Sequence, residues 1–260
     1  MKRTNPLNPV ARLQHFAAFV FDMDGVIIDS HPVHRKAWRT FLLTLGKRAS
    51  NREMDFILDG HKRNDILRHF LGDLSEAELA RYGAMKDDFF RRTSSQMKPI
   101  PGVLHFLQQL HRRGIALGLA TSASFDRTSS TLRRMNISHY FHAVVTGEDV
   151  SQGKPNPAVY HLARQRLNVR PSEVIAFEDA VAGVQAARHA GLRCAGVGPS
   201  RRAKELLAAG AEFVIADFTE FAPFKRAPAA GKLTISSRTK RGNSVSAGAA
   251  PNPDSSLCSE

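Results

Sequence analysis

Two carboxylates stand one residue apart directly after a short apolar run. Asp22 and Asp24 follow residues 17–20, which have the composition of a buried strand. Side chains at positions i and i+2 of a strand point the same way, so both carboxylates would project into the crevice where open α/β sheets bind ligands. Such a pair suits phosphoryl transfer, although an Asp-x-Asp sequence alone fits a solvated turn equally well.

Three further polar motifs follow later apolar runs. They are the pair Thr121 and Ser122, the single Lys154, and the pair Glu178 and Asp179. Each has a structural explanation when taken alone, because the first and third fit helix caps and the second fits a surface lysine. Their positions at the ends of successive predicted strands favour one shared site, since the carboxyl ends of parallel strands meet at one edge of a sheet.

The elements that must position these residues alternate between strand and helix from Pro101 onward. The predicted strands cover residues 17–22, 115–120, 143–146, 174–177, 193–197 and 213–215. The predicted helices between them cover residues 102–113, 126–135, 157–167 and 180–190. This alternation predicts an α/β fold, a doubly wound parallel sheet covered on both faces.

One long segment interrupts that alternation after the first strand. Residues 33–98 have helical periodicity throughout, and Ser75 with Glu78 forms a capping box at the start of one helix. We therefore predict an all-helical cap at 31–98, inserted into a core formed by 15–30 and 99–222. Residues 26–30 would be its flexible base. The Ala-, Gly-, Ser- and Pro-rich segment 226–260 and residues 1–14 are predicted to be disordered tails.

Composition limits the possible functions. The chain has 260 residues, 42% of them hydrophobic and 23% charged, with a net charge of +13 and a pI of about 10.3. Both ends are basic, and the remaining excess is spread over many helices without a basic-aromatic stripe. Nucleic acid is therefore not the expected main partner. A modest positive field suits an enzyme that attracts an anionic small molecule.

Two cysteines cannot build a disulfide framework, so we expect a reducing compartment, the cytoplasm. No apolar run is long enough to span a bilayer, and the basic start lacks the apolar segment of a secretory signal. We expect a monomer with no membrane partner.

Taken together, the four motifs resemble the signature motifs of the haloacid dehalogenase superfamily. They are residues 21–27 (Phe-Asp-Met-Asp-Gly-Val-Ile), 120–122 (Ala-Thr-Ser), 153–155 (Gly-Lys-Pro) and 177–179 (Phe-Glu-Asp). The chain is similar to the phosphatase and β-phosphoglucomutase branch, in which a helical cap follows the first strand. The resemblance covers roughly residues 15–222 and implies a Rossmann-like core.

The resemblance also implies the chemistry of the acids. Asp22 would be the nucleophile that forms an aspartyl-phosphate, and Asp24 would be the general acid and base. Asp22, the backbone carbonyl of Asp24, and Asp179 would hold Mg²⁺, with Glu178 a ligand or its neighbour. The second aspartate argues against dehalogenation, which needs no such acid.

The phosphate-binding groups follow from the same resemblance. Lys154, Thr121 and the backbone of Ser122 would hold the phosphate oxygens, because positioning and charge stabilisation dominate phosphoryl transfer.

The cap is expected to choose the substrate. His34, Arg63 and Lys86 are the candidate substrate contacts, whereas Trp38 fits the core of the cap better. A zinc half-site at His31 and His34 lacks a third ligand cluster in the sequence.

The predicted function is hydrolysis of a small phosphorylated metabolite such as a sugar phosphate. The alternative is a β-phosphoglucomutase-type mutase. That pattern has a lysine just before Gly60, where this chain has Asp59, so we expect less positive charge near a second phosphate unless Lys62 compensates. A more distant alternative is a non-catalytic basic binding protein.

Overall fold

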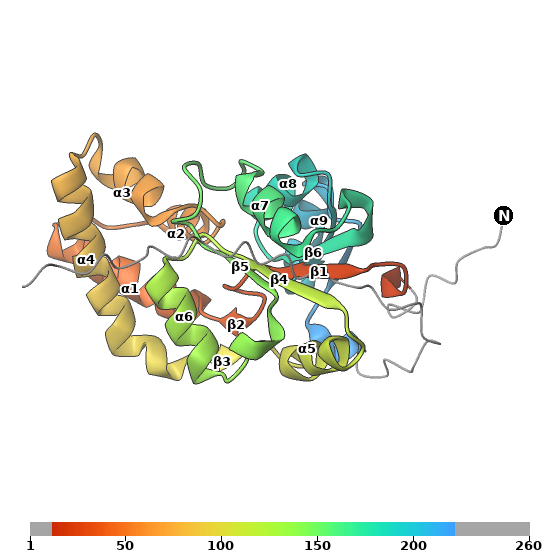
Figure 1. Cartoon of the computed structure of the whole chain (residues 1–260). Coiled ribbons are helices and arrows are strands. Elements are labelled where there is room, and N and C mark those ends of the chain that lie inside the picture. Colours follow the sequence, from red (N-terminus) through yellow and green to blue (C-terminus); the bar gives the residue numbers. More distant parts are fainter. Residues whose placement is uncertain (1–11, 222–260) are drawn as a thin grey trace, which may run out of the picture. The chain divides into compact units, whose positions relative to one another are not determined.

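A parallel sheet carries the site. The computed structural model describes residues 12–221 and contains a six-stranded sheet with the strand order β5-β4-β1-β6-β7-β8 (Figure 1). The strands are β1 Ala18–Phe21, β4 Ala116–Ala120, β5 Ala143–Val145, β6 Val174–Glu178, β7 Arg193–Val197 and β8 Phe213–Ile215. All neighbouring pairs are parallel. β1 lies in the middle, paired with β4 and β6, so the ends of these three strands are adjacent.

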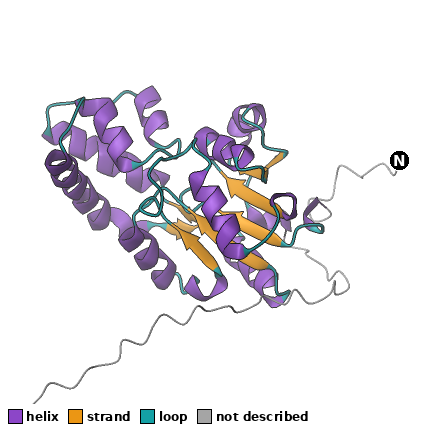
Figure 2. Ribbon diagram, turned by 45° about the horizontal axis from the view of Figure 1, so that its top comes forward, coloured by secondary structure: helices purple, strands orange, loops and turns teal. Residues whose placement is uncertain are grey.

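Helices cover both faces of this sheet, and Figure 2 shows the strands between them. They are α5 Val103–Arg112, α6 Phe125–Arg134, α7 Ala158–Leu167, α8 Val181–His189 and α9 Ser200–Ala208. Alternate residues of β1 face opposite sides. Phe19 and Phe21 join an aromatic core with Phe106 of α5, whereas Val20 joins the core that contains Tyr160 of α7. This two-sided burial explains why β1 is apolar throughout and carries its first acid only at its end.

Four helices are inserted between β1 and α5. They are α1 His31–Thr44, α2 Asn51–Ile57, α3 Arg63–Leu71 and α4 Glu76–Thr93, followed by the short 3₁₀ helix Ser94–Gln96. Capping boxes at Ser50 and Ser75 define the starts of α2 and α4. Trp38, Phe41 and other apolar side chains of these helices form a separate hydrophobic cluster. The insertion begins and ends at a two-stranded antiparallel ribbon, β2 Ile28–Asp29 with β3 Lys98–Pro99.

The predicted fold class is confirmed, with a doubly wound parallel sheet and a helical cap. The ribbon and α9 were not predicted. Two-residue strands carry no alternation signal, and α9 has Leu206 as its single buried residue, which is too little for a recognisable apolar stripe.

The predicted boundaries of the terminal tails and of the cap have separate outcomes. Leu13 was expected in a disordered tail but is buried in the core, so the predicted boundary at 14 is wrong. Residues 1–11 and the predicted tail 226–260 lie outside the described residues. The bounds 31–98 for a separate cap domain stay a prediction. Between residues 12 and 221, no helix has the length and apolar character to cross a membrane.

Candidate active site

The predicted motifs meet at the carboxyl ends of β1, β4 and β6. Asp22 directly follows β1, and its backbone N–H donates to the carbonyl of Phe177 in β6 at 3.0 Å. Thr121 directly follows β4, while Glu178 is the last residue of β6. The parallel register therefore brings together side chains that are far apart in the sequence.

Lys154 lies at the centre of this group although it comes from a loop before α7. Its Nζ donates to Asp22 Oδ1 at 2.6 Å, to Glu178 Oε1 at 2.5 Å and to the carbonyl of Ala120 at 3.3 Å. Only 3% of Lys154 is exposed. Tyr160 also donates to Glu178 Oε1, at 2.7 Å. Lys154 is thus a buried cation held by two carboxylates, and the surface-lysine interpretation is excluded.

The charges of this group are strongly coupled. Burial lowers the pKa of Lys154, but Asp22 and Glu178 together raise it by more than this. The net shift is upward, and the ammonium stays charged. Burial raises the pKa of Asp22 well above its ordinary value; Lys154 opposes this shift, and Glu178, Asp24 and Asp179 add to it. One lysine does not balance these acids, and further positive charge would favour the ionised form of Asp22.

A metal ion fits this need. Asp22, Glu178 and Asp179 each offer a carboxylate oxygen within 4.8 Å of the others. Asp179 Oδ2 is buried and, within residues 12–221, accepts no hydrogen bond of good geometry. A Cβ added at Gly25 would overlap this oxygen, so the glycine leaves room beside it. Hard oxygen ligands of this kind favour Mg²⁺ or a similar divalent ion.

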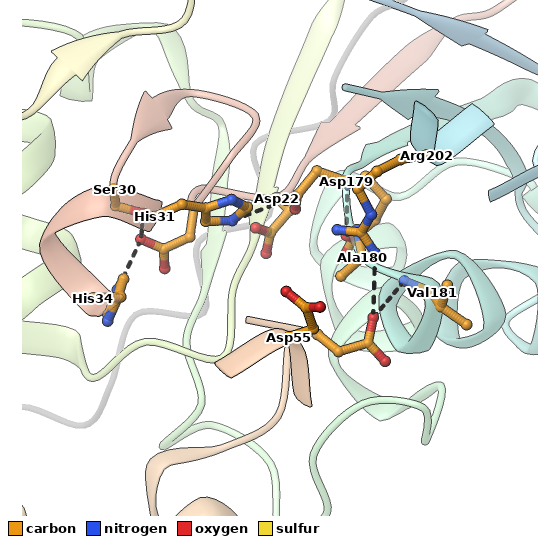
Figure 3. Close-up of polar contacts among 12 residues, drawn as sticks. Asp22, Ser30, His31, His34, Asp55, Asp179, Ala180, Val181 and Arg202 are labelled. Atoms are coloured by element: carbon orange, nitrogen blue, oxygen red, sulfur yellow. Dashed lines mark hydrogen bonds and ion pairs between the residues drawn. The ribbon is translucent and has the colours of Figure 1, made fainter. Parts of the chain in front are cut away.

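His31 lies beside the same carboxylate. Its Nε2 is 3.0 Å from Asp179 Oδ2. Both residues are labelled in Figure 3. Burial lowers the pKa of His31, but Asp179, Asp24 and Asp29 together raise it more, and the net shift is upward. A zinc half-site at His31 and His34, which the sequence already disfavoured, gains no support, because the one metal-competent group found between residues 12 and 221 contains no histidine.

Asp24 has a different environment from Asp22. Its Oδ1 accepts hydrogen bonds from Ser30 Oγ at 2.6 Å and Arg127 Nη1 at 2.8 Å, and its Oδ2 accepts from Arg127 Nη2 at 2.6 Å. Burial raises the pKa of Asp24, but Arg127 and His34 together lower it more, so the carboxyl is held well below its usual range. The Asp24 carboxylate is not part of the metal-competent group. Metal binding through its backbone carbonyl stays a prediction.

His34 contacts this carboxylate as a neutral ring. Its Nε2 lies 3.4 Å from Asp24 Oδ1, and the ring packs against Phe90 of α4 at 4.5 Å between centroids. Burial and the nearby Lys86 lower the pKa of His34 to about 3. The contact with Asp24 is therefore not an ion pair at neutral pH.

The predicted cap residues face the same cavity. A cavity of about 390 Å³ is lined by His34, Arg63, Lys86 and Trp38, together with Asp22, Asp24 and Asp179. Arg63 and Lys86 share Asp87, at 2.5 and 3.3 Å. Burial lowers the pKa of Lys86 to about 8. Trp38 belongs to the core of the cap, as predicted, and also reaches the cavity.

The prediction that Asp59 adds negative charge near the substrate is wrong, whereas the absence of a lysine at this position stands. Asp59 does not line the cavity; its Oδ1 accepts a hydrogen bond from the backbone N–H of Val181 at 2.8 Å, at the start of α8. Arg202 of α9 lies 3.8 Å from the same oxygen (Figure 3, at the labels Val181 and Arg202). The carboxylate thus stabilises a helix N-terminus and joins the cap to the core.

The neighbouring residues of this cap loop also contact the core. Lys62 donates from Nζ to the carbonyl of Val150 at 2.6 Å, and Ser122 Oγ donates to the carbonyl of Gly60 at 2.7 Å. The hydroxyl of Ser122 is therefore hydrogen-bonded to the cap. This arrangement agrees with the expectation that only its backbone would contact phosphate. Thr121 is buried and lines the cavity.

Sequence reasoning did not find Arg127 or Tyr160. Arg127 lies in the first turn of α6, six residues after Thr121, and no local pattern marks it. Tyr160 fits the apolar face of α7, and its hydroxyl partner Glu178 lies 18 residues away. Both residues acquire their roles only when strands and helices pack.

The fold and the site together define an α/β enzyme whose helical cap covers an acidic, metal-competent crevice. The chain belongs to the haloacid dehalogenase-like hydrolase family, whose model matches residues 19–197. The family had been inferred from the four motifs, and this inference is confirmed.

Named relatives include phosphatases and a mutase. The chain is 36% identical over 204 residues to a phosphorylated carbohydrates phosphatase of Thermotoga maritima, covering 75% of this chain and 91% of that protein. It is 32% identical to a fructose-1-phosphate phosphatase of Escherichia coli (69% and 95% covered) and 33% identical to a β-phosphoglucomutase of Bacillus subtilis (70% and 83% covered).

Solved structures agree with the fold. The β-phosphoglucomutase of Clostridium difficile superposes with a TM-score of 0.69 at 26% identity, covering 79% of this chain and 92% of that one. CbbY from Rhodobacter sphaeroides, in complex with phosphate, superposes with a TM-score of 0.70 at 27% identity, covering 79% and 96%.

Proposed function

We propose that this phosphoric monoester hydrolase removes phosphate from a small phosphorylated carbohydrate, through an aspartyl-phosphate at Asp22. The observation that carries the proposal is the buried contact of Lys154 with Asp22 and Glu178, two of the three carboxylates that can share a cation. The substrate class is supported by relatives named as phosphatases of phosphorylated carbohydrates and of fructose 1-phosphate.

Mg²⁺ is the proposed cofactor. Asp22, Asp179 and the backbone carbonyl of Asp24 would hold it, with Glu178 as a further ligand or a neighbour that orients Lys154. When bound, the ion supplies positive charge that offsets the repulsion between a carboxylate nucleophile and a phosphate dianion.

In the first step, a carboxylate oxygen of Asp22 attacks the phosphorus and the bond from phosphorus to the carbohydrate oxygen breaks. The Lys154 ammonium, the Thr121 hydroxyl and the Ser122 backbone N–H hold the phosphate oxygens during this step. Once it has left the Arg127 guanidinium, Asp24 takes up a proton from solvent. It gives this proton to the leaving oxygen, and the alcohol departs.

In the second step, Asp24 accepts a proton from water while the water oxygen attacks the phosphorus. The bond from phosphorus to Asp22 breaks, which releases inorganic phosphate and restores the carboxylate. Asp24 has to turn away from Arg127 before the first step, because both of its oxygens are engaged there.

The mutase stays the second candidate, since one relative is a β-phosphoglucomutase. A mutase must hold a second phosphate firmly, and Arg63, Lys86 and Arg127 supply cations around the cavity. The negative charge of Asp59 no longer argues against the mutase, because that carboxylate faces α8. The lysine of the mutase pattern is still absent at this position. The phosphatase is preferred because the other two relatives described above are phosphatases.

The test is a screen of phosphorylated carbohydrates with Mg²⁺ and with a chelator. We expect release of inorganic phosphate with Mg²⁺ alone, without a bisphosphate activator, and none with the chelator. Interconversion of glucose 1- and 6-phosphate that requires a bisphosphate would identify the mutase instead. Asp22→Asn should abolish turnover, whereas the same change at the exposed Asp29 should not. The basic binding protein would be identified by a different result. The wild type would bind an anionic ligand in a salt-dependent way without turnover, and Asp22→Asn would bind it equally well.

We further propose a monomeric enzyme of the cytoplasm, with no nucleic acid as its main partner. Support for a reducing compartment comes from Cys194, which is a free thiol buried in the sheet. Light scattering on the purified protein tests the monomer.

A further inference from the structure

Arg127 links Asp24 to the cap. The arginine belongs to α6 of the core, and its guanidinium lies 5.3 Å from the Phe90 ring of α4 and 3.5 Å from His34 Nε2 of α1. Its side chain is 19% exposed. Both of its terminal nitrogens donate to Asp24, one to each carboxylate oxygen. Arg127 is therefore enclosed between the proposed acid and two residues of the cap.

This pair raises a problem of charge when Asp24 turns toward the leaving oxygen. The guanidinium would lose both carboxylate oxygens while it remains between Phe90 and the neutral ring of His34. An arginine that is mostly removed from water and lacks an anion is unfavourable. A replacement anion of the right shape would remove that cost.

The other acids near Arg127 already have partners. Asp87, whose charge acts on Arg127 after that of Asp24, pairs with both Arg63 and Lys86. Glu148, which also lines the cavity, accepts a hydrogen bond from the backbone N–H of Phe125 at 3.1 Å. The guanidinium presents a planar pair of donors, which matches a carboxylate or a phosphate in two-point contact. A substrate that enters the cavity is the remaining source.

We propose that Arg127 is a positioning residue that exchanges Asp24 for a second anionic group of the substrate, a carboxylate or a phosphate remote from the scissile phosphate. The exchange frees Asp24 to reach the leaving oxygen. It makes the enzyme selective for phosphorylated carbohydrates with a second negative group. The inference rests on the proposed function and adds the charge of the substrate to it.

The test compares matched substrates. Glucose 6-phosphate and 6-phosphogluconate differ at carbon 1, where the second has a carboxylate; fructose 6-phosphate and fructose 1,6-bisphosphate differ by one phosphate. With Mg²⁺ present, we expect kcat/KM to be about 10- to 100-fold higher for the partner that carries the second anionic group, in at least one pair. This is the usual effect of hydrogen bonds to a charged group. Because the exchange frees the acid, kcat must rise and not only KM fall.

Variants locate the effect. Arg127→Gln should reduce the preference to near one, and Arg127→Lys should keep part of it, because lysine retains the charge without the two-point geometry. Arg133→Gln removes the same charge from an exposed position of the same helix and should keep the full preference. Thermal unfolding of each variant confirms folding, and Arg127→Lys provides the test if Arg127→Gln does not fold.

The outcomes separate this inference from the proposed function. Absence of phosphate release from every substrate, in wild type with Mg²⁺, would contradict the proposed function itself. Phosphate release without any preference in either pair, or a preference that appears only in KM, or one that survives in Arg127→Gln, would overturn the exchange while the phosphatase remains.

Discussion

Lys154 provides the sharpest test of the site's electrostatics. The change Lys154→Met removes a cation that lies 2.6 Å from Asp22 and 2.5 Å from Glu178 and is 3% exposed, while its volume is largely kept. Breaking a buried ion pair by removing one partner typically costs about 3–5 kcal/mol, because the other charge is left without compensation. We expect a loss of that size in the free energy of unfolding, with turnover abolished.

The loss should depend on pH in a defined direction. Burial raises the pKa of Asp22 and of Glu178, and Lys154 is the principal group that opposes this. Without the lysine, the folded variant holds protons on these carboxyls that the unfolded chain releases at the same pH. The free energy of unfolding of the variant should therefore rise relative to wild type as the pH falls toward the ordinary carboxyl range, and decline as the pH rises.

Urea unfolding at several pH values between about 5.5 and 8, without divalent ions, measures both effects. Lys204→Met makes the same change at an exposed position of α9 and should alter stability by less than about 0.5 kcal/mol. A loss below about 1 kcal/mol in Lys154→Met, or a deficit that grows as the pH falls, would refute the reasoning that Lys154 neutralises buried carboxylates.

Further predictions concern the metal site and the cap. Gly25→Ala places a Cβ against Asp179 Oδ2 and should abolish stabilisation by Mg²⁺ in thermal unfolding. Gly46 has a similar positive φ with open space around it, so Gly46→Ala should leave that stabilisation intact. Both should lose about 1–2 kcal/mol from backbone strain; equal Mg²⁺ responses would contradict the site. Asp59→Ala removes the hydrogen bond to the start of α8 and should cost about 1 kcal/mol in urea unfolding, more than Asp55→Ala on the surface. An equal cost would show that the contact contributes nothing. Removal of Mg²⁺ by a chelator should lower the melting temperature of the wild type. The decrease should be smaller in Asp22→Asn, because this variant has lost one carboxylate ligand of the ion.

The core motifs could be placed from sequence because each follows a strand that is apolar on both faces. The strand β1 contains no polar residue, so the first acids after it mark its end. The same logic located Thr121 after β4 and Glu178 at the end of β6. Local signals also defined α4 through Ser75. These features depend on residues that are close in the sequence.

Contacts between distant segments could not be predicted in the same way. Asp59 was expected near the substrate, but its position on the cap loop places it against α8. Arg127 has the sequence context of an ordinary helical arginine, and its partner Asp24 is 103 residues away. Such contacts depend on how the cap lies against the core, which no periodicity encodes.

The sequence by itself determined the parallel α/β class, the inserted helices and the acids and lysine of the core motifs, because burial and strand ends impose local patterns of apolar and polar residues. Only the tertiary structure decided which charge meets which: Lys154 between Asp22 and Glu178, and Arg127 on Asp24. Coulombic attraction and hydrogen bonding depend on distances in space and on exclusion of water. Both are set when the elements pack and not by spacing along the chain.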